Sequence, residues 1–92
     1  MHVAHEQFET KGAFVAIDQN TKAGEMTYSK AGDSLIIIDH TEVDPAFGGQ
    51  GVGKKMVLAA VDFAREKGIK ILPLCPFAKA AFDKDATIQD VL

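Results

Sequence analysis

The segment D-P-A-F-G-G-Q-G-V-G-K-K, residues 44–55, contains four glycines within six positions, followed directly by two lysines. It joins the apolar stretch S-L-I-I-I-D-H-T-E-V, residues 34–43, to a segment with helical periodicity. Glycines crowded between a strand and a helix allow the backbone to approach a bound group closely. Lys54 and Lys55 would lie in the first helical turn, where the helix dipole disfavours positive charge. We therefore expect an anion to bind at this loop.

Two nucleotide-binding motifs are similar to this loop but fail in detail. Gly48-x-x-x-x-Gly53-Lys54 has the spacing of a P-loop, yet Lys55 replaces the Ser or Thr that would bind Mg²⁺. From Gly49 onward the glycines follow G-x-G-x-G, which differs from the dinucleotide-binding fingerprint G-x-G-x-x-G. A tight turn alone is a further alternative, but it would need only one or two glycines.

The composition is that of an ordinary globular domain. With 92 residues, 47% of them hydrophobic and 25% charged, the chain can bury a stable core without disulfides. A net charge of −3 argues against nucleic-acid binding, and no apolar stretch reaches the roughly 20 residues of a membrane span. One cysteine and three histidines show no metal-ligand spacing, and the N-terminus does not resemble a signal peptide. We expect one cytoplasmic domain, residues 1–92, with no metal, nucleic-acid or membrane partner.

The hydrophobic pattern predicts an α+β fold. The expected strands span residues 5–10, 13–17, 23–29, 35–43 and 69–74, and the expected helices span residues 52–67 and 77–82. Lys11-Gly12 is predicted to be the first turn, and T-I-Q-D at residues 87–90 resembles a capping box for a last helical turn. The final strand–helix–strand order implies a right-handed crossover and a parallel pair. The expected architecture is a mixed sheet, in which an antiparallel meander is followed by a βαβ unit around one central helix.

In this setting, residues 48–53, G-G-Q-G-V-G, resemble the motif Arg/Gln-x-x-Gly-x-Gly/Ala of the GNAT superfamily of acyl-CoA-dependent N-acetyltransferases. Gly51 and Gly53 match this motif, whereas Gly48 replaces the usual Arg or Gln, a loss for which Gln50 or Lys54 could compensate. H-T-x-V at residues 40–43 and C-P-F at residues 75–77 extend the resemblance to the abbreviated, single-domain subgroup. The similarity covers residues 39–82.

The resemblance implies a GNAT-like sheet and acetyl-CoA as cosubstrate. Backbone N–H groups of the glycine loop would bind the pyrophosphate of CoA. Pantetheine contains amides and would pair with the main chain of residues 41–43, like a short additional strand. The expected cofactor-binding residues are Thr41, Val43, Gly48, Gly49, Gln50, Gly51, Val52, Gly53, Lys54 and Lys55, with Glu42 as a further main-chain partner.

Three side chains are candidates for catalysis. Strict alternation along the fourth strand would place His40 and Glu42 on the same face as Ile36 and Ile38. The resemblance assigns the general base to this strand, so His40 or Glu42 would deprotonate the acceptor amine, without a choice between them. Cys75 ends the fifth strand before a helix, which can lower a thiol pKa, so it could accept acetyl or protonate departing CoA. Alternatively, His40 supports the loop, Glu42 is solvated and Cys75 is a small buried hydrophobe.

These residues predict a small N-acetyltransferase that moves acetyl from acetyl-CoA to a primary amine. The turn at Lys11-Gly12 leaves no room for the helices that enclose the acceptor site of larger relatives, so a protein amine or a small molecule would fit equally. One alternative is an acyl-CoA-binding module without efficient turnover. Another is a protein-interaction module without affinity for CoA.

Overall fold

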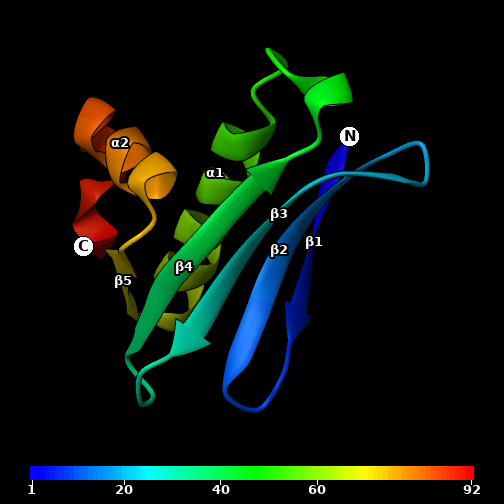
Figure 1. Cartoon of the computed structure of the whole chain (residues 1–92). Helices are drawn as coiled ribbons and strands as arrows, with labels where there is room; N and C mark the ends of the chain where they lie inside the picture. The colour runs from blue at the N-terminus through cyan, green and yellow to red at the C-terminus, as the bar shows by residue number, and fades with distance from the viewer.

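The structure, a computed structural model of residues 1–92, is a five-stranded mixed sheet with two helices (Figure 1). Its elements are β1 (His2–Gln7), β2 (Lys11–Asp18), β3 (Thr21–Lys30), β4 (Leu35–Val43), the 3₁₀ turn η1 (Pro45–Phe47), α1 (Val52–Lys67), β5 (Lys70–Pro73), α2 (Pro76–Lys84) and the 3₁₀ segment η2 (Ala86–Val91). The strand order is β1-β2-β3-β4-β5; the first four strands are antiparallel and β5 is parallel to β4. The predicted fold class is confirmed.

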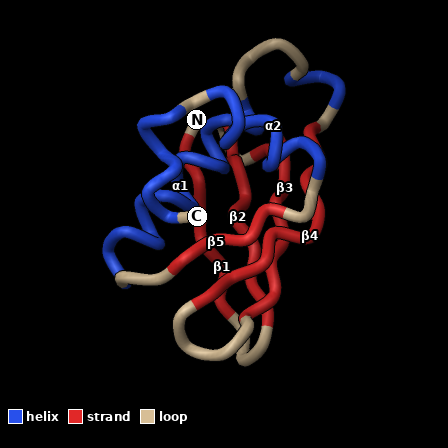
Figure 2. The backbone as a smooth tube through the Cα atoms, turned by 90° about the vertical axis from the view of Figure 1, so that its left-hand side faces the viewer, coloured by secondary structure: helices blue, strands red, loops and turns tan.

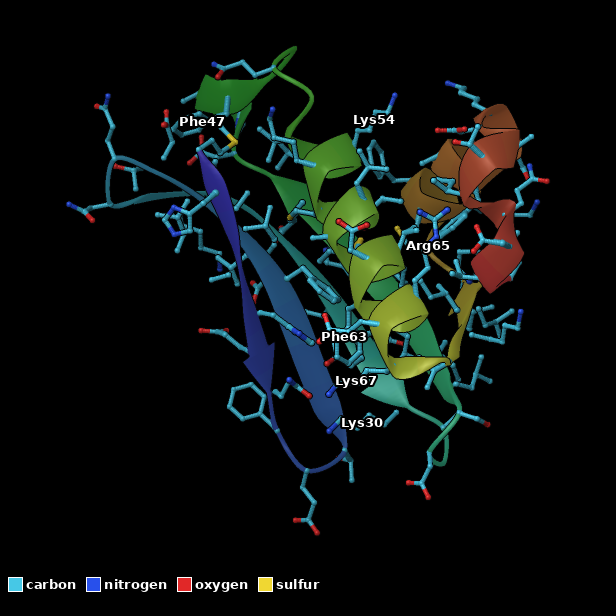
Figure 3. The ribbon with its side chains drawn as sticks, turned by 180° about the vertical axis from the view of Figure 1, so that it is seen from behind. Lys30, Phe47, Lys54, Phe63, Arg65 and Lys67 are labelled. Carbon is cyan, nitrogen blue, oxygen red and sulfur yellow. The ribbon has the colours of Figure 1, made fainter.

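The core lies between one face of the sheet and the helices. Helix α1 runs along this face and contacts all five strands, while α2 packs against α1, β4 and β5 (Figure 3). The largest fully buried side chains are Tyr28, Phe14, Phe82, Met26, Ile38, Met56, Val52, Val57 and Val61. The glycine-rich loop lies at one end of the sheet, and the β1–β2 and β3–β4 turns lie at the other (Figure 2). No helix is both long enough and apolar enough to cross a membrane.

The two elements that flank the glycine loop begin and end as predicted. Strand β4 spans Leu35–Val43 and helix α1 spans Val52–Lys67. Gly68 ends α1 in the left-handed conformation, with φ of 67°, and its N–H bonds to main-chain oxygens of the last turn. The last helical turn is present as η2, but its N-cap is Asp85 rather than the predicted Thr87.

The N-terminal hairpin differs from the prediction. Strand β1 covers residues 2–7 instead of 5–10, and the turn lies at Phe8–Thr10, where Phe8 N–H donates to Lys11 O (2.8 Å). The predicted turn at Lys11-Gly12 is therefore wrong, because both residues belong to β2. Gly12 lies there for a packing reason: a Cβ atom at this position would be 2.3 Å from Cζ of the buried Tyr28.

The buried Tyr28 forms a polar pair with the half-buried His5. The Tyr28 hydroxyl lies 2.6 Å from His5 Nε2, and the His5 ring stacks on Phe14 and meets the edge of Phe63. Burial lowers the pKa of His5, and the nearby charge of Lys30 adds to this effect. Burial also raises the pKa of Tyr28. The pair is therefore neutral at physiological pH and satisfies two polar groups inside an aromatic cluster.

We expect Gly12→Ala to destabilise the protein by about 1–3 kcal/mol, because the added methyl group would overlap a buried ring that cannot move away. For a chain of this size, each 1 kcal/mol corresponds to a fall in Tm of about 4–8 °C. Thermal unfolding would measure this loss of stability. Gly48→Ala is the matched control, since Gly48 has φ of −59° and a Cβ there meets only an ordinary contact. Equal stability of the two variants would contradict this account of Gly12.

Candidate functional site

Strands β4 and β5 separate at a bulge in β4. Pairing with β5 ends at Ile38↔Pro73, and the Ile38 carbonyl accepts hydrogen bonds from both Leu74 and Cys75 N–H (3.1 Å each). On the other side of β4, Thr27 pairs with His40 but Tyr28 pairs with Ile38, so Asp39 is an extra residue. Residues 39–43 of β4 consequently continue without β5 as a neighbour.

The bulge reverses the alternation of side chains along β4. Ile36 and Ile38 are buried on the face of the sheet that the helices cover. Beyond Asp39, however, it is Thr41 that lies opposite the buried Met26 of β3. The prediction that His40 and Glu42 share a face with Ile36 and Ile38 is therefore wrong. They do share a face with each other, but it is the exposed, outer face of the sheet.

The bulge also determines which main-chain groups remain free. Asp44 N–H donates to Ala23 O (2.9 Å) and therefore points toward β3. Main-chain groups that point toward the same neighbouring strand recur every two residues, so those of Glu42 and His40 also point toward β3. The main-chain groups of Thr41 and Val43 then face the opening that β5 leaves. Of the three expected main-chain partners, Glu42 is thus oriented the wrong way, whereas Thr41 and Val43 are oriented toward an incoming chain of amides.

The glycine loop brings unpaired N–H groups to the same end of the sheet. Gly49 and Gly51 adopt left-handed conformations, with φ of 79° and 72°, and Gly51 is the N-cap of α1. The first hydrogen bond within the helix is Lys55 N–H to Gly51 O (3.0 Å). The preceding N–H groups, of Val52, Gly53 and Lys54, therefore have no partner within the helix. No side chain caps this end of α1, and its first turn contains no acidic residue.

The charges at the loop favour an anion. Lys54 and Lys55 are exposed in the first turn of α1, where both face the positive end of the helix dipole, and neither forms an ion pair. In Figure 3, Lys54 lies between the start of α1 and α2. The pyrophosphate of CoA fits this arrangement, since it can accept from the free N–H groups and neutralise the lysines.

Gly53 has a packing role in addition to the one that its motif predicts. It is buried in the first turn of α1, and a Cβ atom there would be 2.3 Å from Cζ of Phe77, the second residue of α2. The absence of a side chain allows α2 to approach α1 closely. Gly24 serves similarly in β3, where a Cβ would be 2.8 Å from Glu42 O and 3.1 Å from Val52. Gly24 was not predicted to belong to this region, and Phe77 was predicted only as part of the C-P-F motif.

Cys75 lies where β4 and β5 separate. It is the N-cap of α2, its exposed fraction is 5%, and its thiol donates to Thr41 Oγ1 (3.3 Å). Burial acts to raise the pKa of the thiol, but the Thr41 hydroxyl and the nearby N–H groups of Ala78, Phe77 and Thr41 favour the thiolate, and their combined effect lowers the pKa. A thiolate here is therefore stabilised inside the sheet opening. His40 and Glu42, on the outer face of β4, are not grouped with it.

The sequence profile of the GCN5-related N-acetyl-transferase family matches residues 8–91 of this chain. The curated protein NATD1 of Xenopus tropicalis is 36% identical over 50 residues, which make up 54% of this chain and 46% of NATD1. The chain thus spans about half the length of the curated relatives that it matches.

Two solved structures show the same fold. A GCN5-like protein from Staphylococcus aureus is 42% identical, with a TM-score of 0.70 over 96% of this chain and 85% of that one. A protein from Bacillus anthracis, described as a streptothricin acetyltransferase and solved with acetyl coenzyme A, is 22% identical, with a TM-score of 0.60 over 72% of this chain and 39% of that one. Together with the separated β4–β5 pair and the glycine loop before α1, these matches show that the chain belongs to the GCN5-related N-acetyltransferase family.

Proposed function

We propose that this protein transfers the acetyl group of acetyl-CoA to a primary amine. The observation that supports it best is the coincidence, at one end of the sheet, of an uncapped helix N-terminus and an opening between β4 and β5. The loop residues 48–55 would bind the pyrophosphate, and the main chain of Thr41 and Val43 would pair with pantetheine. Acetyl-CoA supplies an activated thioester, which this geometry would direct toward Cys75.

The outer face of the sheet suits an amine acceptor. Glu42 lies opposite Glu25 of β3, and both line a hollow of about 250 Å³ together with Asp44 and with Lys22, which pairs with Glu25 (2.8 Å). The carboxylates of Glu42 and Asp44, which form no ion pair, would attract a protonated amine, whose reference pKa is near 10.4 for lysine. His40, on the same face, or Glu42 itself would then remove the proton before attack. The acceptor would approach from this face, opposite the side of the helices.

Cys75 offers a route for transfer in two steps. In the first step, its thiolate would attack the thioester carbonyl, so that acetyl is bound to Sγ and CoA leaves as a thiolate that takes up a proton. In the second step, the neutral amine would attack the acetyl group, Sγ would leave as a thiolate and the amine would lose its proton to the base. In the direct alternative, the amine attacks acetyl-CoA itself and Cys75 only lines the opening or protonates departing CoA. As a free thiol, Cys75 fits a reducing compartment such as the cytoplasm.

A binding module that holds acyl-CoA without turnover is the second candidate. It is favoured by Gly48, which lacks the side chain that the family motif supplies at its first position. Incubation with acetyl-CoA and a panel of amines, followed by intact-mass analysis and measurement of released CoA, separates the two. Bound acetyl-CoA that never transfers its acetyl group, so that no free CoA appears, would support the binding module.

Gly51→Asp should abolish CoA binding, because a carboxylate would occupy the place proposed for the pyrophosphate. For the wild type, CoA at a hundred times its Kd adds about 2.7 kcal/mol of stability, which thermal unfolding detects readily. Gly32→Asp is the matched control: it also has φ of 72° and no neighbour within 4 Å, but lies in the β3–β4 turn. A normal CoA-induced shift in folded Gly51→Asp protein would refute the assignment of the loop.

The ionisation of Cys75 can be followed by the ultraviolet absorbance of its thiolate, with Cys75→Ser as the blank. Because hydrogen bonds stabilise the thiolate, we expect half-ionisation below the pH of an ordinary thiol, about 8.5. Thr41→Val removes the hydroxyl that contacts Sγ, so the transition should move to higher pH. Thr27→Val, on the outer face of the sheet, should leave the transition in place. An unchanged transition in Thr41→Val would contradict the role given to Thr41.

The two-step route predicts that wild-type protein, given acetyl-CoA without an acceptor, releases an equimolar amount of CoA and gains an acetyl group that hydroxylamine removes. Cys75→Ala should lose both this burst and turnover while its Kd for CoA stays within about twofold of wild type. If transfer is direct, Cys75→Ala keeps most of its activity, and His40→Ala or Glu42→Gln shows the loss instead. Full activity in Cys75→Ala would remove the thiol from the mechanism.

A further inference from the structure

A pocket of about 290 Å³, the distal pocket, lies at the end of the sheet opposite the glycine loop (Figure 2). Its lining comes from β1, β3, the β3–β4 turn, β4, the C-terminal half of α1 and Ile69, which follows α1. From Lys54 at the glycine loop to Lys67 at this pocket, α1 extends about 20 Å, at 1.5 Å per residue. No residue proposed for acetyl transfer belongs to the distal pocket.

Two lysines of the distal pocket have no carboxylate partner. Lys30, the last residue of β3, is half-buried, and its ammonium group donates to Phe8 O (2.8 Å) but forms no ion pair. Lys67, in the last turn of α1, is exposed and forms no ion pair either. Figure 3 shows both side chains close to Phe63, near the C-terminal end of α1. Removing a charge from water is costly unless an opposite charge lies near it, so the half-buried Lys30 favours a bound anion.

The charge of the lining matches an anion with one negative charge. Asp33, in the β3–β4 turn, is the one acidic residue of the lining, and it pairs with neither lysine. Two lysines and one aspartate leave a single net positive charge, which a carboxylate neutralises. A phosphate dianion would leave one negative charge uncompensated near the C-terminus of α1, where the helix dipole disfavours it.

The remaining walls suit a flat, apolar group. Phe63, Leu35 and Ile69 line the distal pocket. The Phe63 ring is held in place by an edge contact with His5 (centroids 4.4 Å apart) and by Phe14 (6.1 Å). A ring whose orientation is already fixed can pack against a ligand at little cost in entropy. The volume of about 290 Å³ equals that of roughly ten waters at about 30 Å³ each, which is room for about ten non-hydrogen atoms.

We propose that the distal pocket binds a small carboxylate with an apolar body, with the carboxylate between Lys30 and Lys67 and the apolar body against Phe63. The site is independent of acetyl transfer, because it shares no residue with the glycine loop, the β4–β5 opening or the outer face near Glu42. His5 would report its occupancy. The charge of Lys30 adds to burial in lowering the pKa of His5, so a carboxylate that offsets this charge should raise that pKa.

Benzoate is the test ligand, with benzamide as its neutral counterpart and inorganic phosphate as the competing anion. Calorimetric titration of the wild type should give a Kd for benzoate of about 1 mM or lower, and roughly tenfold weaker binding of benzamide and of phosphate. Lys67→Gln should weaken benzoate about three- to tenfold, and its exposed position makes a loss of folding unlikely to interfere. Lys55→Gln is the matched control, because Lys55 is also exposed and unpaired on α1 but lies at the glycine loop.

The histidine ring signals in nuclear magnetic resonance spectra give a second readout. The pKa of His5, followed by its ring signals against pH, should rise in saturating benzoate and stay in place in benzamide. His2 and His40 are exposed and do not line the distal pocket, so their ring signals should be the same with and without benzoate.

Equal affinities for benzoate and benzamide, an unchanged affinity in Lys67→Gln, or an unmoved His5 titration would overturn the proposal. Loss of binding in Lys55→Gln, or displacement of benzoate by CoA, would place the anion at the glycine loop and overturn it equally. Tighter binding of phosphate than of benzoate would refute the choice of a carboxylate. A wild type that binds benzoate as expected but does not bind CoA would support this site and overturn the proposed function.

Discussion

The bulge at Asp39 is the constraint on which the rest of the site depends. An extra residue in β4 lies directly after Ile38, where the pairing with β5 ends, and the Ser29 hydroxyl donates a hydrogen bond to Asp39 Oδ2 (2.8 Å). Without the bulge, strict alternation along β4 would direct the main chain of Thr41 and Val43 toward β3, where it would be occupied. One residue of register therefore decides which main-chain groups of β4 face the opening.

The same bulge decides what lies inside the opening. Because it moves Thr41 to the helix side of β4, the Thr41 hydroxyl and N–H meet Cys75 and help to stabilise its thiolate. In an uninterrupted strand Thr41 would instead face solvent, and the charged side chain of Glu42 would lie over the core. Burying an unpaired carboxylate is costly, so the apolar packing and the chemistry favour the same register.

The sequence predicts the scaffold well and the geometry of the site poorly. The boundaries of β4 and α1 follow from strong signals: a run of Ile residues, a continuous helical stripe and Gly68 at the end. The bulge leaves no such signal in the sequence. Strict alternation is then the only guide to the face on which a strand residue lies, and it places His40 and Glu42 on the wrong face.

The turn prediction for Gly12 fails for a related reason. Gly12 lies within β2, where an aromatic ring from a distant segment, Tyr28, packs against it. Phe77 packs against Gly53 in the same way, and this contact is an addition to the role that the motif predicts. A glycine in a sequence shows that a side chain is missing, not whether conformation or packing requires this. Gly49 and Gly51 do need left-handed conformations, which is the property that turn chemistry can anticipate.

The two sides of the sheet would give the cosubstrate and the amine separate paths to the place where β4 and β5 part. Thr41 and Cys75 lie on the helix side of the sheet, whereas His40 and Glu42 lie on the outer face, which no helix covers. A cosubstrate that enters from the helix side and an amine that enters from the outer face would meet only where β4 and β5 part. Such a division would direct an anionic cosubstrate to the lysines at the start of α1 and a cationic amine to the unpaired carboxylates of the hollow. On this geometry a different acceptor on the outer face would require no change in the residues proposed to bind CoA.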